Sequence, residues 1–139
     1  MTPAGYQKQT ASAAYLEVSA IKHSEEFLAL VNEVLPNVRE IDVKRAIARI
    51  DDGAVLIDVR EDREWEEGHA ADAVHMGRGI IERDIVGVYP DKDTELILYC
   101  GGGFRSALAT ENLQKMGYTN VYSMTGGWKA WKEAELPVV

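Results

Sequence analysis

The sequence is poor in residues that form cross-links or metal sites, with one cysteine and three histidines among 139 residues. A single thiol cannot form an internal disulfide, and the Cys and His spacings typical of metal sites are absent. No apolar run approaches the roughly 20 residues that span a bilayer, and no hydrophobic segment follows a basic N-terminus. These absences predict a cytoplasmic protein that neither crosses a membrane nor carries a metal or another cofactor.

The chain is also short of positive charge, with 15 Lys and Arg residues against 23 Asp and Glu residues and a formal net charge of −8. This balance argues against nucleic acid or an anionic membrane surface as a partner. An anionic substrate would therefore have to be held by local hydrogen-bond donors against a repulsive background.

Apolar runs alternate with amphipathic segments along the chain, which is long enough for one domain with a core. The alternation predicts an α/β fold, with a parallel sheet of about five strands and helices on both faces. Residues 1–36 are expected to form an N-terminal tail and helix beside a domain over residues 37–139. The expected strands lie at 54–59, 73–76, 95–100 and 120–124, and the expected helices at 24–35, 41–50, 60–70, 78–90, 104–117 and 126–137.

Polar residues follow the two strongest of these strands. Asp58 comes after "AVLI", and Cys100 comes after "LILY". Ligands of open α/β sheets bind beyond the carboxyl ends of the strands, so both residues are candidates for a functional site.

Cys100 is followed directly by Gly101, Gly102 and Gly103. A lone cysteine at a strand end is often a small apolar filler, and one or two glycines are enough for a turn. Three in succession make sense where backbone N–H groups converge on one point, as in a concave nest that binds an anion. The combination favours a reactive cysteine over a structural one.

The residues after the glycines strengthen this interpretation. A helix is expected to begin near Phe104, and its positive N-terminal end would favour a thiolate over a thiol. Arg105 would add a fixed positive charge in the same loop, and Ser106 would cap the helix or donate its hydroxyl. The sequence therefore places residues 100–106 at the centre of the candidate site.

The surroundings of this cysteine limit its chemistry. No second cysteine is available to resolve a disulfide, and no histidine is expected near the loop as a general base. A nucleophile served only by backbone amides needs a leaving group that departs without a proton. Sulfane sulfur and phosphate esters are the main substrate classes that meet this condition.

Three sequence blocks, in this order, resemble the rhodanese family of sulfurtransferases. They are "VLIDVREDREWEEGHAADAVHM", "LILYCGGGFRSALAT" and "MTGGWKAWKEAELPVV", and the resemblance covers roughly residues 38–139. It implies a single-domain enzyme that takes sulfur from a small anionic donor such as thiosulfate and forms a persulfide on Cys100. The persulfide sulfur would then pass to cyanide, a thiol or a protein acceptor. A monomer or weak dimer is expected.

The resemblance also implies that the N–H groups of Gly101 to Arg105 cradle the outer sulfur. Two positions depart from the two-domain thiosulfate enzymes of the family. Gly102 stands where those enzymes often have Lys or Arg, and Glu64 stands where they have Arg. Arg78 would compensate if its loop folds over the site, and the alternative for Arg78 is an exposed charge at a helix start.

Asp58 and Arg60 match the Asp-x-Arg pattern of the family. One role for such a pair is to order the cysteine loop from the neighbouring strand. The alternative is a buried structural ion pair, in which Glu64 is one candidate partner of Arg60. We expect the structural role for Arg60, and both roles stay open for Asp58.

Two other functions compete with the sulfurtransferase. The chain would act as a sulfur carrier or regulatory module if it turned over only with a protein partner. A cysteine-dependent phosphatase is the weaker alternative, because four residues separate Cys100 from Arg105. The phosphatase relatives of the family have five residues there, which makes room for a larger tetrahedral anion.

Overall fold

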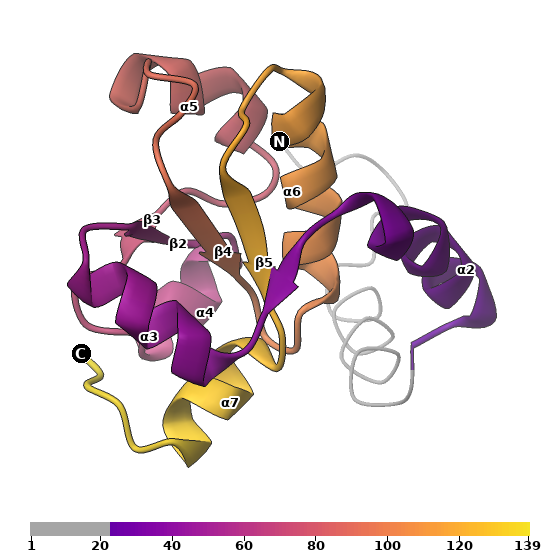
Figure 1. The fold of residues 1–139 in the computed structure, drawn as a ribbon. Helices are drawn as coiled ribbons and strands as arrows, with labels where there is room; N and C mark the ends of the chain where they lie inside the picture. Colours follow the sequence, from indigo (N-terminus) through magenta and orange to yellow (C-terminus); the bar gives the residue numbers. More distant parts are fainter. Residues whose placement is uncertain (1–22) are drawn as a thin grey trace, which may run out of the picture. The chain divides into compact units, whose positions relative to one another are not determined.

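The computed structural model describes residues 23–139, and Val31–Val139 forms one compact unit (Figure 1). The tail expected at the N-terminus lies outside the described residues. The expected domain boundary after residue 36 stays a prediction.

The helix expected over residues 24–35 is present as α2 (Glu25–Val34). It begins where the Ser24 hydroxyl accepts a hydrogen bond from the Phe27 amide at 3.0 Å. A 3-10 turn, η1 (Leu35–Asn37), follows directly, with its proline at the start. The sequence prediction for this helix is therefore confirmed at both ends.

Five parallel strands form one sheet in the spatial order β1-β5-β4-β2-β3, which confirms the predicted α/β class. The central strand β4 is buried along its whole length, as its continuous apolar sequence predicts. The sequence does not locate the two-residue edge strand β1, which forms by pairing with β5. The strands are β1 (Glu40–Ile41), β2 (Val55–Asp58), β3 (Val74–His75), β4 (Leu96–Tyr99) and β5 (Val121–Met124).

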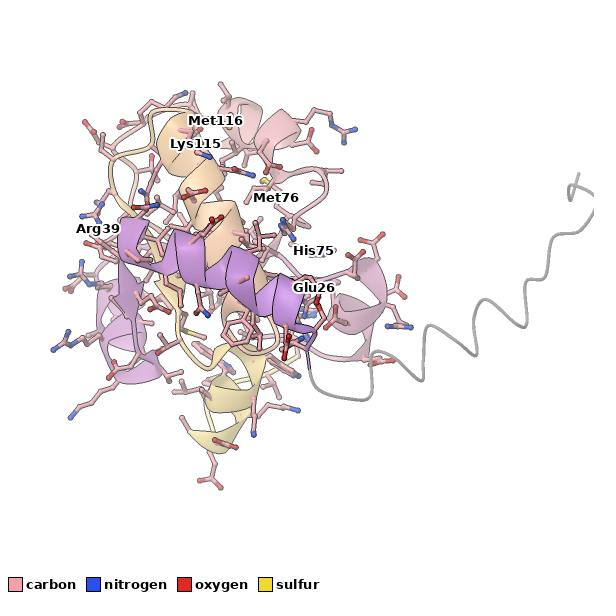
Figure 2. All side chains as sticks on the ribbon, turned by 90° about the vertical axis from the view of Figure 1, so that its right-hand side faces the viewer. Glu26, Arg39, His75, Met76, Lys115 and Met116 are labelled. Carbon is pink, nitrogen blue, oxygen red and sulfur yellow. The ribbon has the colours of Figure 1, made fainter. Side chains whose placement is uncertain are left out.

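Helices cover both faces of this sheet (Figure 1). Successive side chains of β4 alternate between the two faces, so Leu98 joins one hydrophobic cluster and Ile97 joins the other. Helices α5 and α6 pack on the Leu98 face, where Met116 at the end of α6 is half-buried (Figure 2). Helices α3 and α7 pack on the Ile97 face. The helices are α3 (Val43–Asp51), α4 (Asp62–Glu67), α5 (Ile81–Val88), α6 (Phe104–Lys115) and α7 (Gly127–Glu133).

The carboxyl ends of the three central strands lie along one edge of the sheet. Strand β2 leads into the segment before α4, β4 leads into residues 100–103, and β5 leads into the turn before α7. Among residues 23–139, every helix is too short or too polar to traverse a lipid bilayer. The parallel topology therefore brings the two polar strand ends predicted from the sequence to neighbouring positions.

Candidate active site

The sulfur of Cys100 lies at the N-terminal end of α6, directly after β4. It accepts hydrogen bonds from the amides of Gly103 at 3.1 Å and Ser106 at 3.4 Å. The thiol in turn donates to the Ser106 hydroxyl at 3.5 Å. The cysteine is 1% exposed. Two orphan amides of a helix N-terminus are thus directed at one buried sulfur, and their dipoles favour negative charge there.

The Ser106 hydroxyl ties the loop to the neighbouring strand. It donates to the Gly103 carbonyl at 3.1 Å and shares a 2.8 Å hydrogen bond with the hydroxyl of Ser123 on β5. Both serines are fully buried. The helix cap is Gly103, in the left-handed conformation with φ at +111°. Of the two roles expected for Ser106, the N-cap belongs to Gly103, and the Ser106 hydroxyl donates to the Gly103 carbonyl while it accepts from the Cys100 thiol.

Helix α7 holds the backbone of the loop from the other side. The Trp128 amide donates to the Cys100 carbonyl at 2.7 Å, and the Lys129 amide donates to the Gly101 carbonyl at 3.3 Å. In a trans peptide the N–H points opposite to the C=O, so the amides of Gly101 and Gly102 face away from α7. Neither amide has a hydrogen-bond acceptor within residues 23–139.

This approach of α7 to the loop depends on Gly127. Its φ is +50°, and an added Cβ would overlap the Cys100 carbonyl oxygen and lie 2.9 Å from the Gly101 carbonyl carbon. Both the conformation and the close approach require glycine here. The sequence shows "GGW" only as part of a family pattern, and its contact with the cysteine loop is seen only in the structure.

Arg105 binds Glu64 of α4 through two parallel hydrogen bonds, at 2.7 and 3.0 Å. Its guanidinium lies over the loop, because a Cβ on Gly101 would be 3.1 Å from Arg105 Nη2. The hydrogen bonds from Arg105 lower the pKa of Glu64. The same bonds raise the pKa of Arg105, to which the nearby Cys100 also contributes. The fixed positive charge expected in the loop is present, and a carboxylate neutralises it.

Asp58, Arg60 and Tyr99 form a buried polar network. Arg60 binds both carboxylate oxygens of Asp58, and the Tyr99 hydroxyl donates to Asp58 Oδ2 at 2.6 Å. Arg60 is 3% exposed and Asp58 is fully buried. The ion-pair partner of Arg60 is therefore Asp58 rather than Glu64. Asp58 makes no hydrogen bond to the sulfur within the described residues. It is linked to the cysteine loop through Tyr99, which precedes Cys100, and through Arg60, whose guanidinium lies over the ring of Trp128.

The sequence does not single out Tyr99 as a member of this network, because it stands at the end of the apolar run "LILY". The signal that could have identified it is that a buried tyrosine hydroxyl needs a hydrogen-bond partner. Burial raises the pKa of Tyr99, and its hydrogen bond to Asp58 adds to the effect. Tyr99 therefore stays a neutral hydrogen-bond donor.

Two other predicted site residues, Arg78 and Phe104, are half-buried near the cysteine loop and the end of β2. Arg78 is half-buried, and its amide donates to the Val59 carbonyl at 3.0 Å, just beyond the end of β2. No partner of its guanidinium occurs within residues 23–139. Phe104 is the first residue of α6 and is half-buried. The same part of the chain contains no cluster of three or more His, Cys, Asp or Glu residues able to hold a metal ion.

Comparison with known proteins places these features in a family. A family model described as rhodanese-like domain matches residues 42–134. The thiosulfate sulfurtransferase GlpE of Haemophilus influenzae is 31% identical over 101 residues, which are 72% of this chain and 93% of that protein. GlpE of Coxiella burnetii is 32% identical over 78 residues, or 56% of this chain and 71% of that protein.

Solved structures show the same fold. A protein of unknown function from Rhodopseudomonas palustris, described as a possible tyrosine phosphatase, matches with a TM-score of 0.72 and 28% identity. The match covers 86% of this chain and 98% of that chain. The homodimeric polysulfide-sulfur transferase of Wolinella succinogenes matches with a TM-score of 0.70 and 25% identity, over 82% of this chain and 87% of that chain.

Proposed function

Since the chain belongs to the rhodanese-like domain family, we propose that Cys100 carries sulfane sulfur, as a persulfide, from a donor such as thiosulfate to a thiophilic acceptor. The Cys100 thiolate attacks the outer sulfur of thiosulfate. The S–S bond of the donor breaks, sulfite leaves with the bonding electrons, and Cys100–S–S⁻ remains. Cyanide or a thiolate then takes the outer sulfur as thiocyanate or as a new persulfide, which restores the Cys100 thiolate.

The observation that carries this proposal is the set of backbone amides around the sulfur. Gly103 and Ser106 already donate to Cys100 Sγ. The amides of Gly101 and Gly102, which have no acceptor within residues 23–139, supply further donors for an outer sulfur. Donors oriented before the reaction stabilise developing negative charge with little reorganisation.

Access to the buried sulfur passes through the glycine segment. Gly102 is exposed, and nothing lies within 4 Å of the position its Cβ would take. This part of the loop can therefore shift without displacing a side chain. We assign donor binding to residues 101–106 and to Arg78, whose guanidinium has no partner in the described part of the chain. Asp58 would act on the loop indirectly, through Tyr99 and through Arg60 stacked on Trp128.

The experiment that tests the proposal is mass spectrometry of the intact protein after incubation with thiosulfate, an organic persulfide or polysulfide. The expected result is one added sulfur atom on the wild type, removed again by cyanide with release of thiocyanate. Cys100→Ser should show no added sulfur and no thiocyanate formation, while its circular dichroism spectrum and melting temperature stay close to those of the wild type. The absence of added sulfur with every donor would contradict the proposal.

The burial of Cys100 favours a second candidate function, that of a sulfur carrier. A cysteine that is 1% exposed is poorly placed for rapid exchange of its sulfur with small molecules, and docking of a partner protein would open the loop. A persulfide that forms but turns over slowly until an acceptor protein is added would support the carrier. Phosphatase activity is disfavoured, because the Arg105 guanidinium, which a phosphate would need as a hydrogen-bond donor, is already bound to Glu64.

A further inference from the structure

The charges around the cysteine loop nearly cancel. Arg105 is the only basic residue in residues 100–106, and Glu64 occupies its guanidinium through two hydrogen bonds. Arg60, at the end of the neighbouring strand, is matched in the same way by Asp58. Two guanidinium groups that follow β2 in the chain, those of Arg63 on α4 and of Arg78, have no hydrogen-bond or ion-pair partner within residues 23–139. Neither guanidinium forms a hydrogen bond or ion pair with residues 100–106, so the charge at the loop is set mainly by the pair of Glu64 and Arg105 and by the proposed thiolate.

This balance matters because sulfane donors differ in charge. Thiosulfate carries two negative charges, whereas an organic persulfide or an alkyl thiosulfonate carries one. The protein has a formal net charge of −8, so the background also repels anions. Repulsion between a fixed carboxylate and a donor is proportional to the charge of the donor, and a dianion suffers twice as much as a monoanion.

We infer, on the basis of the proposed function, that Glu64 selects the sulfur donor by charge. By neutralising Arg105, it favours singly charged donors such as organic persulfides and thiosulfonates over the thiosulfate dianion. Glu64 acts through Arg105 and is a specificity-determining residue rather than a catalytic one.

Sulfur transfer from a singly charged donor to Cys100 needs no oxidant, reductant or other reagent. For methanethiosulfonate, the Cys100 thiolate attacks the sulfane sulfur, and the bond between that sulfur and the sulfonyl sulfur breaks. Methanesulfinate leaves with the bonding electrons, and Cys100–S–S⁻ forms, so two negative charges are present before and after the step. Methanethiosulfonate resembles thiosulfate with one charged oxygen replaced by a methyl group. The two donors therefore form a pair that differs mainly in charge.

The test compares kcat/KM for these two donors, with cyanide as the acceptor, in the wild type and in Glu64→Gln. The glutamine keeps a side-chain oxygen for the Glu61 amide, which donates to Glu64 Oε1 at 3.2 Å, and removes the charge together with the acceptor for one of the two Arg105 hydrogen bonds. The expected increase is about tenfold for thiosulfate and about threefold for methanethiosulfonate, because the Coulomb energy is proportional to donor charge. The change should appear in KM rather than in kcat, since the charge acts on binding.

Two variants control this comparison. Glu67→Gln makes the same change of charge on the same helix, at an exposed side chain, and should leave both kcat/KM values within about twofold. Glu64→Asp keeps the carboxylate and should keep the ratio of the two donors near that of the wild type. A purely structural role of Glu64 would instead lower kcat/KM for both donors by the same factor.

A salt titration of the wild-type protein keeps the inference testable if Glu64→Gln does not fold. Screening weakens repulsion, so raising NaCl from about 20 to about 150 mM should increase kcat/KM more for thiosulfate than for methanethiosulfonate. A decrease for thiosulfate would overturn the inference. A donor ratio in Glu64→Gln equal to that in Glu67→Gln would overturn it while leaving persulfide formation intact. Failure of both donors to add sulfur to Cys100 would overturn the proposed function as well.

Discussion

Two polar assemblies lie at the carboxyl ends of neighbouring strands, and they differ in how completely their hydrogen bonds are satisfied. In the buried polar network after β2, both oxygens of Asp58 accept hydrogen bonds from Arg60, and Tyr99 also donates to one of them. In the cysteine loop after β4, the amides of Gly101 and Gly102 have no acceptor within residues 23–139. The hydrogen-bonding capacity of the network is used within the fold, whereas two amides of the loop are left as the donors that we propose for the outer sulfur.

The two assemblies also differ in what holds them in place. Side-chain hydrogen bonds hold the network, whereas the Cys100 and Gly101 carbonyls at the start of the loop are held by backbone amides of α7. A backbone-held loop can consist of glycines, which leave room for an approaching donor. We therefore expect substitutions in the network to act mainly on stability and substitutions around the glycines to act mainly on sulfur transfer.

The largest effect is expected on stability, when the buried network of Asp58, Arg60 and Tyr99 loses its carboxylate. Asp58→Ala leaves the Arg60 guanidinium buried without its carboxylate and should lower the free energy of unfolding by about 3–5 kcal/mol. Urea unfolding at neutral pH measures this loss. The double variant Asp58→Ala/Arg60→Met removes both charges and should recover a large part of it. A loss below about 1 kcal/mol in the single variant would show that the network does not stabilise the fold.

The second largest effect is expected from disturbing the contact between α7 and the cysteine loop. In Gly127→Ala the new Cβ overlaps the Cys100 carbonyl oxygen, so the loop must shift. The rate of sulfur transfer should fall about a hundredfold, as expected for a misplacement of about 1 Å. Steady-state thiocyanate formation measures the rate.

Gly53→Ala is the matched control for this variant. Gly53 also has a positive φ, at +110°, but nothing lies within 4 Å of its added Cβ. Backbone strain should cost each variant about 1–2 kcal/mol of stability. Gly127→Ala should lose more than Gly53→Ala, because its Cβ also overlaps the Cys100 carbonyl oxygen. The transfer rate should fall only in Gly127→Ala, and equal rates in the two variants would show that the contact with α7 does not position the cysteine.

The smallest effect is the pH dependence of the ion pair between Glu64 and Arg105. The hydrogen bonds from Arg105 hold the pKa of Glu64 below its value in the unfolded chain. The pair therefore contributes its full stability above that unfolded pKa, and the contribution is lost as the pH falls through the folded pKa. The contribution should stay below about 1 kcal/mol, because both side chains are partly exposed to solvent.

Urea unfolding of the wild type and Glu64→Gln, at about pH 7 and about pH 3, checks this expectation. The wild type should be the more stable protein at neutral pH, and the difference should shrink in acid. A difference that grows in acid would contradict the assigned direction of the Glu64 pKa.

Much of the fold could be predicted from the sequence, because its strongest elements are local patterns. The apolar runs at 54–59 and 95–100 indicate buried strands, and β2 and β4 form there. The edge strand β1 has two residues and no apolar run. It exists because the Ser123 and Thr125 amides donate to the Arg39 and Ile41 carbonyls, and these residues are distant in the chain.

The contacts within the candidate site could not be predicted from the sequence. Arg60 and Glu64 are close in sequence and of opposite charge, which made them a reasonable pair. Arg60 instead binds Asp58, two residues away across the end of a strand. Glu64 binds Arg105, a residue 41 positions further along the chain. Charge alone does not choose between such partners, since several carboxylates compete for each guanidinium.

The sequence by itself determined the parallel α/β architecture and the thiol followed by three glycines and a helix start. These features depend on neighbouring residues, whose periodicity, backbone freedom and hydrogen-bonding capacity are local properties. Only the tertiary structure decided that α7 holds the Cys100 carbonyl and that a carboxylate neutralises Arg105. Such contacts join residues far apart in the chain, and they form because packing of helices on the sheet brings those residues within hydrogen-bonding distance.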